Sequence, residues 1–461
     1  MKIRFVVCVI AIVIWACDST QNNFEVMVTS FDQTQLLKVQ PLPEPLADTT
    51  PVTIVIDSKQ TFQEMDGFGY TLTGGSAMHL RGMSKEARRN LLEDLFSEDH
   101  GIGVSYIRLS VAASDLDPDP YSYAEIPEGE VDSELNSFSI ERDREYLIPV
   151  LKEILAINPD LRLMASPWSP PRWMKDNGDS RGGSLLPEFY ATYAAYLVKY
   201  ITAMKSEGIH IDAMTVQNEP LHPGNNPSLL MLPEQQAEFV GQHLGPAFEA
   251  NGIDAKIIIY DHNADRPDYP ITVLNDPEAR KYIHGSAFHL YGGEVEAISQ
   301  VHEAHPDKHL YFTEQWVGAP GNFAGDFNWH VRELIIGASR NWCKTVLEWN
   351  LSSNPSLEPH TDRGGCDRCL GAVTIDGDQV TRNPAYYIIA QASKYVRPGS
   401  VRIYSNLSEG LANVAFKTPE GGVVLIALNE SDTDKSLKIE LDGKTIETSL
   451  TAGSVGTFML N

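Results

Sequence analysis

Short apolar runs alternate with longer amphipathic runs through most of the chain. The short runs are rich in β-branched and aromatic residues and have the length of buried strands. The predicted strands are residues 67–70, 104–110, 161–166, 213–217, 256–260, 286–290, 310–313 and 345–349. Because helical patterns lie between these strands, the order predicts repeated β–α units with parallel strands.

The longer runs carry apolar residues at the three- and four-residue spacing of an amphipathic helix. The first of them begins after Ser84, which we expect to cap the helix. Its apolar face consists of Leu91, Leu92, Leu95 and Phe96. Comparable helical runs occupy residues 187–208, 232–252 and 327–342.

Eight strands interleaved with helices predict a (β/α)8 TIM barrel in residues 66–395, a fold of the α/β class. The structural alternative is a doubly wound open sheet. Neither a Gly-x-Gly-x-x-Gly motif nor a P-loop follows the first predicted strand, and this counts against the open sheet.

The chain changes character after Val396, where the helical runs stop. Strand-like segments broken by turn pairs such as Asp442-Gly443 predict a β-sandwich in residues 396–461. A further strand pattern in residues 51–65 precedes the barrel and has no evident partner there. We expect it to complete the sandwich, so that this appended domain is built from both chain ends.

Residues 1–17 resemble a bacterial lipoprotein signal peptide. Lys2 and Arg4 precede an apolar run too short to span a bilayer, and Cys17 follows a small residue, as in a lipobox. We therefore expect lipidation of Cys17 and export to the bacterial cell envelope, on the periplasmic side or at the cell surface. The alternatives are a plain signal peptide with an incidental cysteine and a transmembrane anchor. Residues 18–50 are polar with scattered prolines, which predicts a flexible tether.

The composition narrows the range of partners. The formal net charge is −26, and hydrophobic residues make up 42% of the chain. This apolar fraction excludes disordered, collagen-like and coiled-coil classes. An acidic surface disfavours nucleic acid and anionic membranes, so we expect membrane contact only through the N-terminal anchor. A neutral substrate fits best.

The cysteines predict one local disulfide. Cys366 and Cys369 stand in a glycine-rich loop, where an exported protein favours a disulfide between them. The alternatives are a reduced pair and a metal site completed by His360 and Asp362. Cys343 lies in a helix-like run, and we expect it to be buried and unreactive.

Candidate catalytic side chains follow the predicted strands, because the active sites of TIM barrels lie at the carboxyl ends of the strands. Asn218 and Glu219 follow the fourth strand, and Glu314 ends the seventh. Two carboxylates across a cleft are what acetal hydrolysis requires, one as proton donor and one as anion. The other residues at strand ends are Asp115, Trp168, His289, Tyr291, Glu348, Trp349 and Asn350.

Each of these features also has a purely structural interpretation. Asn-Glu-Pro is a common turn, and Glu314 alone is compatible with a salt bridge at the rim. Single tryptophans are more often packed in a core than stacked on a ligand. His289 fits a hydrogen-bonded core histidine, and Glu348 fits a buried pair with Arg108. The conjunction of two glutamates at opposite strand ends favours the catalytic interpretation.

Seven motifs in order resemble a known family over residues 52–461. They are DGFGYTLTGGSA, SYIRLSVAASDLD, LMASPWSPPRWMK, TVQNEP, DPEARKYIHGSAFHLYGG, LYFTEQWVG and VLEWNLSSNPS. The family is glycoside hydrolase family 30, which contains lysosomal glucosylceramidase and bacterial and fungal β-1,6-glucanases.

This resemblance implies a retaining mechanism with Glu219 as acid/base and Glu314 as nucleophile. It places Asn218 on the sugar 2-hydroxyl, Tyr291 on the nucleophile, and Arg108 beneath the nucleophile as its charge partner.

The resemblance also places Asp115, Trp168 and Trp349 around the terminal sugar and His289 close to the floor of the cleft, which completes the set of substrate-binding candidates. We expect no cofactor and no metal. The Gly-Gly-Cys loop after the eighth strand is closer to the β-1,6-glucanase branch, which favours a β-linked glucan as substrate.

Three further functions stay open at this point. The same mechanism is compatible with glucosylceramide, small β-glucosides or xylan. A catalytically inactive barrel would make the protein a surface glycan-binding lipoprotein. A metal hydrolase would use His289, Asp261 and His262, although their spacing matches no metal motif.

Overall fold

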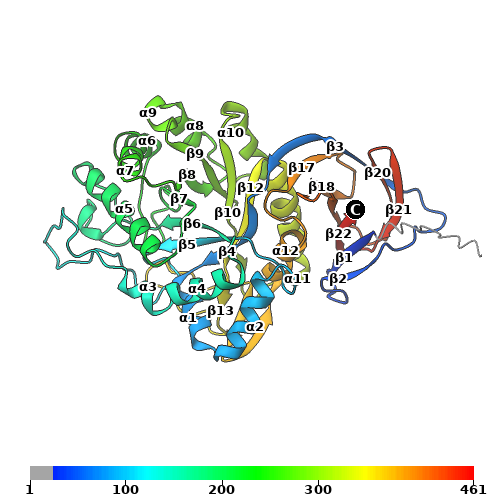
Figure 1. Cartoon of the computed structure of the whole chain (residues 1–461), viewed down its shortest axis with the longest axis horizontal. Helices are drawn as coiled ribbons and strands as arrows, with labels where there is room; N and C mark the ends of the chain where they lie inside the picture. The colour runs from blue at the N-terminus through cyan, green and yellow to red at the C-terminus, as the bar shows by residue number, and fades with distance from the viewer. Residues whose placement is uncertain (1–23, 461) are drawn as a thin grey trace, which may run out of the picture.

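Eight parallel strands close into a barrel in the computed structural model, which describes residues 24–460 (Figure 1). The barrel strands are β4 (Gly67–Leu72), β5 (Tyr106–Val111), β6 (Arg162–Pro167), β7 (Ala213–Thr215), β8 (Lys256–Asn263), β9 (Ile283–His289), β10 (His309–Glu314) and β12 (Cys343–Asn350). They neighbour one another in chain order, and β12 closes the ring by pairing with β4. The barrel prediction is confirmed with all eight strands, and the open sheet is excluded.

Helices surround the barrel and cover its outer face (Figure 1). They are α1 (Gly74–Gly82), α2 (Lys85–Phe96), α3 (Glu141–Glu145), α4 (Leu147–Ile157), α5 (Tyr190–Ser206), α6 (Pro233–Phe239), α7 (Gly245–Ala250), α8 (Asp268–Asn275), α9 (Pro277–Arg280), α10 (Ile298–Ala304), α11 (Phe323–His330) and α12 (Pro384–Ser393). Ser84 caps α2 as predicted, because its side chain accepts a hydrogen bond from the backbone of Ala87.

The second domain is one strongly curved sheet of nine strands, seen at the right of Figure 1. Its order is β2-β1-β22-β19-β18-β17-β3-β20-β21. The strands are β1 (Glu25–Ser30), β2 (Lys38–Pro41), β3 (Val52–Glu64), β17 (Val401–Ser405), β18 (Ala412–Lys417), β19 (Val423–Asn429), β20 (Lys435–Leu441), β21 (Lys444–Leu450) and β22 (Ser454–Leu460). Strand β3 pairs with β17 and β20, so the domain is built from both chain ends, as predicted.

The prediction of a flexible tether over residues 18–50 is wrong where the nine-stranded sheet takes up β1 and β2, within residues 25–41. Strand β1 pairs along its whole length with β22, and Val26 and Val28 are buried in the core of the sheet. The apolar run of β1, residues 26–28, is short and lies in a stretch that is otherwise polar with scattered prolines, so the stretch as a whole has the average composition of a linker. The lipobox at Cys17 and the predicted signal peptide lie outside the described residues.

Two small sheets lie in the segment that follows the barrel strands β10 and β12. One pairs β11 (Val317–Gly318) with β14 (Cys369–Leu370), and the other contains β13 (Ser352–Ser353), β15 (Val373–Asp376) and β16 (Gln379–Arg382). They fold the long loop after β12 back over the carboxyl end of the barrel. Cys343 is buried as expected, but it begins strand β12 rather than lying in a helix.

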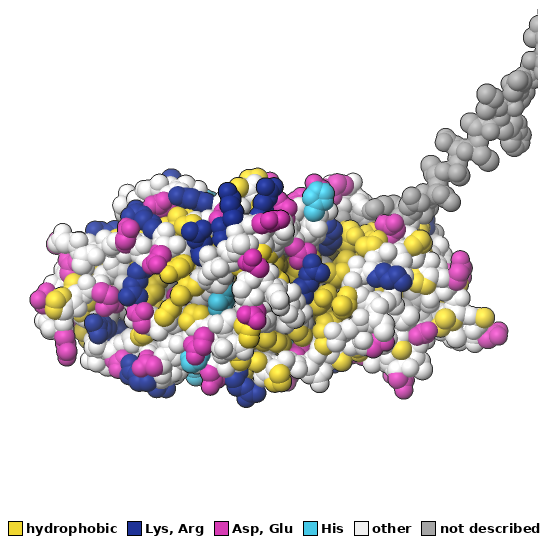
Figure 2. Space-filling model, turned by 90° about the horizontal axis from the view of Figure 1, so that it is seen from below, with side chains coloured by type: hydrophobic (Ala, Val, Ile, Leu, Met, Phe, Trp, Pro, Cys, Tyr) yellow, Lys and Arg dark blue, Asp and Glu magenta, His cyan; other side chains and the backbone are white. Residues whose placement is uncertain are grey.

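Charges of both signs are interspersed on the face shown in Figure 2, with apolar side chains between them. The excess of acidic residues therefore does not form a single-signed surface on that face. Among residues 24–460, no helix combines the length and the apolar character needed to cross a bilayer.

The pairing of β1 with β22 predicts a specific loss of stability. Val26 is 1% exposed on β1, whereas Val39 is 46% exposed on the neighbouring strand β2. Val26→Asp places an unpaired carboxylate in the core and should lower the free energy of unfolding by about 3 kcal/mol or more. The matched Val39→Asp substitution should lower the free energy of unfolding by less than about 0.5 kcal/mol. Equal urea denaturation midpoints for the two variants would contradict the buried position of β1.

Candidate active site

Glu219 and Glu314 lie at the same end of the barrel, beyond β7 and at the end of β10. Glu219 has a φ of 45°, in a region that residues other than glycine rarely adopt. Backbone hydrogen bonds hold this conformation: Asn218 N–H donates to Pro167 at 2.8 Å, and Glu219 N–H donates to Asp261 at 2.9 Å. The turn therefore directs the Glu219 side chain over the barrel.

The two carboxyl groups face one another across a narrow gap. One oxygen of Glu219, one oxygen of Glu314 and a ring nitrogen of His289 all lie within 4.8 Å of one another. Both glutamates are buried, with 7% and 6% of their surface exposed. Carboxyl groups about 5–5.5 Å apart are typical of retaining glycosidases, whereas inverting enzymes leave room for a water molecule between them.

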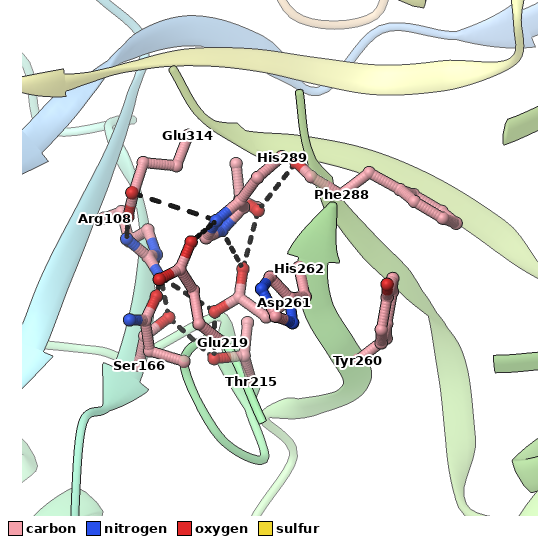
Figure 3. A network of polar contacts seen from close by, with 12 residues as sticks. Arg108, Ser166, Thr215, Glu219, Tyr260, Asp261, His262, Phe288, His289 and Glu314 are labelled. Atoms are coloured by element: carbon pink, nitrogen blue, oxygen red, sulfur yellow. Dashed lines mark hydrogen bonds and ion pairs between the residues drawn. The ribbon is translucent and has the colours of Figure 1, made fainter. Parts of the chain in front are cut away.

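A fully buried arginine holds Glu314 from below (Figure 3). The Arg108 guanidinium donates to Glu314 Oε2 at 2.6 Å and to Asp261 Oδ2 at 2.8 Å. It also donates to Asn218 Oδ1 at 2.6 Å, which leaves the amide nitrogen of Asn218 available to the cavity. Tyr291 donates its hydroxyl to Glu314 Oε1 at 3.1 Å. The carboxylate of Glu314 is thus fixed through both oxygens.

Asp261 connects most of these groups, and sequence reasoning missed this role. Its carboxylate accepts hydrogen bonds from the hydroxyls of Thr215 and Thr313 in addition to Arg108. Tyr260 and Asp261 both have positive φ values, and the pairing of β8 with β9 shifts register there. This bulge turns Asp261 toward the barrel axis. An alternating strand pattern carries no signal for such a bulge.

His289 lies between Asp261 and Glu219. Its Nε2 is 3.1 Å from Asp261 Oδ1, and its Nδ1 is 3.1 Å from Glu219 Oε1 (Figure 3). Burial disfavours the charged imidazolium, but the carboxylates of Glu314, Asp261 and Glu219 outweigh it and raise the pKa of His289 to about 9. The ring is therefore protonated near neutral pH and donates to both neighbours.

The two glutamates have different electrostatic environments. Burial raises the pKa of Glu314, while His289 and Arg108 oppose this increase. Burial acts in the same sense on Glu219, but the hydrogen bond and charge of His289 prevail and lower the pKa of Glu219 to about 2. In the free protein, His289 and Glu219 consequently hold one proton between them, and it rests on His289.

A cavity of about 310 Å³ opens above the two carboxylates. The residues predicted for the site that line it are Asp115, Trp168, Asn218, Glu219, Tyr291, Glu314 and Trp349. The lining residues that sequence reasoning did not assign to the sugar site are His222, Asn225, His262, Asn263, Trp316, Cys366 and Cys369. A larger groove of about 900 Å³ elsewhere contains neither glutamate, so its size does not make it the catalytic site.

Two tryptophan rings and an acidic side chain also line the cavity. The rings of Trp168 and Trp349 lie 5.5 Å apart at an angle of 32°. The Arg108 guanidinium lies 4.8 Å from the centre of the Trp168 ring. Burial, followed by the charge of Glu314, raises the pKa of Asp115 to about 8. Asp115 therefore keeps its proton near neutral pH and is able to donate a hydrogen bond.

Glu219, His289 and Glu314 form the group within the described residues that has the spacing of a metal site. Their surroundings do not suit a cation, because the guanidinium of Arg108 and the protonated ring of His289 already supply two positive charges. His262 is not part of this group, which removes the geometric basis for a metal hydrolase built on His289, Asp261 and His262.

The predicted disulfide between Cys366 and Cys369 is confirmed, which excludes the alternative metal site with His360 and Asp362. The pairing of Glu348 with Arg108 is wrong. Glu348 pairs with His330 at 2.7 Å and not with Arg108. Consecutive strand residues face opposite sides, so Glu348 points to the outer layer while Leu347 and Trp349 point inward.

Comparisons with known proteins identify both parts of the chain. A family model described as the glycosyl hydrolase family 30 TIM-barrel domain matches residues 65–396. A second model, described as the β-sandwich domain of the same family, matches residues 399–458.

Several relatives match over most of their length. Endo-1,6-beta-D-glucanase neg1 of Aspergillus fumigatus is 32% identical over 425 residues, which are 86% of this chain and 85% of that protein. Lysosomal acid glucosylceramidase of Mus musculus is 31% identical over 437 residues, which are 89% of this chain and 84% of that protein. The solved structure of the endo-beta1,6-glucanase BT3312 has a TM-score of 0.88 and 34% identity, and covers 95% of this chain and 99% of that one.

The raised pKa of His289 predicts a pH-dependent contribution to stability. An unfolded histidine titrates near 6.5, whereas His289 titrates at about 9 in the folded protein. This contribution is complete below pH 6.5 and is lost as the pH rises through 9, an effect of about 3 kcal/mol. Urea denaturation at pH 6.5 and 9.5 should show a loss about 3 kcal/mol larger in the wild type than in His289→Asn, because the ionisation of buried Asp115 lowers the stability of both proteins over this range. Parallel pH dependence in the two proteins would contradict the charged state of His289.

Proposed function

The chain belongs to glycoside hydrolase family 30, a family of retaining O-glycosyl hydrolases, and we propose that it cleaves β-1,6-linked glucan by double displacement. The observation that carries the proposal is the pair of buried carboxyl groups of Glu219 and Glu314, within 4.8 Å of one another at the floor of a small cavity. An inactive sugar-binding barrel has no need for such a pair.

In the first step, Glu314 attacks the anomeric carbon and forms a glycosyl ester. Arg108 and Tyr291 orient its two oxygens, so the attack needs little reorganisation. The bond to the leaving oxygen breaks, and Glu219 protonates that oxygen. The proton comes to Glu219 from His289 when bound substrate excludes water and places an ether oxygen against the carboxyl group.

In the second step, Glu219 accepts a proton from a water molecule that attacks the glycosyl ester. Formation of the ester has removed the negative charge of Glu314, which favours the ionised form of Glu219 as a base. Hydrolysis regenerates the Glu314 carboxylate, and the proton returns to His289. Both catalytic groups end in their initial state.

The remaining lining residues have binding roles in this proposal. Asn218 directs its free amide hydrogens to the sugar 2-hydroxyl, and protonated Asp115 donates to another hydroxyl. Trp168 and Trp349 supply apolar walls for the C–H faces of the ring. No step in this mechanism requires a metal or a cofactor.

Glucosylceramide is the second candidate substrate. Two relatives of nearly equal similarity are named for different substrates, an endo-1,6-beta-D-glucanase and a lysosomal acid glucosylceramidase. The solved structure of the endo-beta1,6-glucanase BT3312 covers nearly the whole chain, and this supports the glucan as the preferred substrate.

We also propose that the protein is exported to a bacterial envelope and anchored through a lipid on Cys17. The lipobox-like sequence supports the anchor. The disulfide between Cys366 and Cys369 supports an oxidising compartment.

Substitution of the two glutamates should separate their roles. Glu314→Gln removes the nucleophile and should lower kcat by more than about 10⁴-fold on every substrate. Glu219→Gln removes the proton donor and should lower kcat by about 10²–10⁴-fold on unactivated glycosides, with a smaller loss on dinitrophenyl glycosides. Steady-state kinetics on both substrate types measures the difference. Wild-type turnover by Glu314→Gln would refute the assignment of the nucleophile.

Product analysis distinguishes the two substrate classes. We expect the wild-type protein to shorten β-1,6-glucan and to release little glucose from glucosylceramide in detergent. Chromatographic sizing of the products at matched enzyme concentration is the measurement. Release of glucose from the lipid together with intact glucan would establish glucosylceramide as the substrate instead.

A further inference from the structure

The disulfide between Cys366 and Cys369 lies in the catalytic cavity and not in a remote loop. Both cysteines line the same cavity of about 310 Å³ as Glu219 and Glu314. Cys369 packs with Leu116, Trp168 and Trp349, and Cys366 lies at the edge of this cluster. The sulfur bridge therefore continues the apolar wall that the tryptophans begin.

The two ends of the bridge are held differently. Cys369 belongs to β14, which pairs with β11 only a few residues after Glu314, and its carbonyl accepts a hydrogen bond from Asn350 at 3.3 Å. Cys366 follows Gly364 and Gly365 in the exposed turn region and is half-buried. The bridge thus ties an exposed turn to a strand that is fixed relative to the nucleophile.

The upstream part of the same loop is anchored on the acid/base side. Arg363 forms two hydrogen bonds to Asp179, each at 3.0 Å, and Asn226 donates to the Asp362 side chain at 2.9 Å. Asn226 directly follows Asn225, whose amide donates to Glu219 Oε2 at 3.1 Å. The loop therefore spans the cavity from the side of Glu219 to the side of Glu314, with the bridge at its inner edge.

We propose that the Cys366–Cys369 disulfide is a specificity-determining contact that forms one wall of the sugar subsite and sets its width. This inference rests on the proposed glycosidase function. A cavity of about 310 Å³ has the size of a small-ligand site, so a wall of the cavity is also a contact surface of the bound sugar. Disulfide sulfur is polarisable and offers no strong hydrogen bond, so it selects for a C–H face by shape.

Reduction of the bridge should loosen this wall without altering the catalytic groups. A phosphine reductant such as TCEP breaks the S–S bond, each sulfur gains a proton, and the phosphine becomes its oxide. Cys369 stays in its strand while Cys366 gains freedom to move away. Glu219, Glu314 and Arg108 make no contact through the bridge, so the intrinsic rate of bond cleavage should change little.

The experiment compares the native protein before and after TCEP treatment, with alkylation and mass spectrometry to count the thiols. We expect the KM for a β-glucoside to rise about five-fold in the reduced protein and in Cys366→Ser/Cys369→Ser, with kcat changed less than about two-fold. Isothermal titration of gentiobiose into Glu314→Gln, oxidised and reduced, should show the same loss of affinity.

Two controls make the outcome decisive. Cys343→Ala lacks the free buried cysteine and should respond to TCEP like the wild type, whereas the double serine variant should not respond. An unchanged KM and affinity after verified reduction, with hydrolysis intact, would overturn the wall proposal and leave the glycosidase function standing. No hydrolysis of any β-glycoside by the oxidised wild type would overturn both proposals.

Discussion

A guanidinium with no exposure to water lies beneath the catalytic cavity, and the positions of the other polar groups depend on it. Taking Arg108 out of water costs free energy that only well-placed anions offset. Glu314 and Asp261 supply two such anions, and Asn218 and Ser166 satisfy further hydrogens. Ser166, Asp261 and Glu314 belong to three different barrel strands and Asn218 follows a fourth, so Arg108 connects the ends of four strands.

The same cluster gives the two glutamates in one cavity different surroundings, which underlie the different roles that we propose for them. Glu314 contacts a permanent positive charge, which no proton transfer removes. Glu219 contacts His289, whose charge disappears when its proton moves. Burial raises the pKa of Glu314, but the guanidinium of Arg108 faces its carboxylate throughout the proposed reaction, whereas Glu219 is placed to exchange a proton with His289. The difference arises from position in the barrel, since the two side chains are chemically identical.

The barrel, and the meeting of Glu219 and Glu314 at one end of it, could be predicted because both follow periodic patterns. Apolar runs in the sequence indicate where the strands end, and in a barrel of parallel strands the carboxyl ends all lie at the same end of the barrel. Strand β1 was missed because its apolar run, residues 26–28, is short and lies in a polar stretch with scattered prolines, and its stability comes from pairing with β22 at the other chain end. The connecting role of Asp261 was not predicted, because a bulge in β8 turns its side chain toward the barrel axis. Trp316, Asn225 and the position of the disulfide depend on loops, whose paths no local pattern determines.

Covalent trapping of the glycosyl-enzyme identifies the nucleophile without any substitution in the protein. Incubation with a 2-deoxy-2-fluoro-β-glucosyl fluoride, followed by proteolysis and mass spectrometry, reports which side chain becomes esterified. We expect a stoichiometric label on the peptide that contains Glu314, and on that residue when the peptide is sequenced. A label on Glu219, or turnover with inversion at the anomeric carbon and no label, would contradict the retaining mechanism.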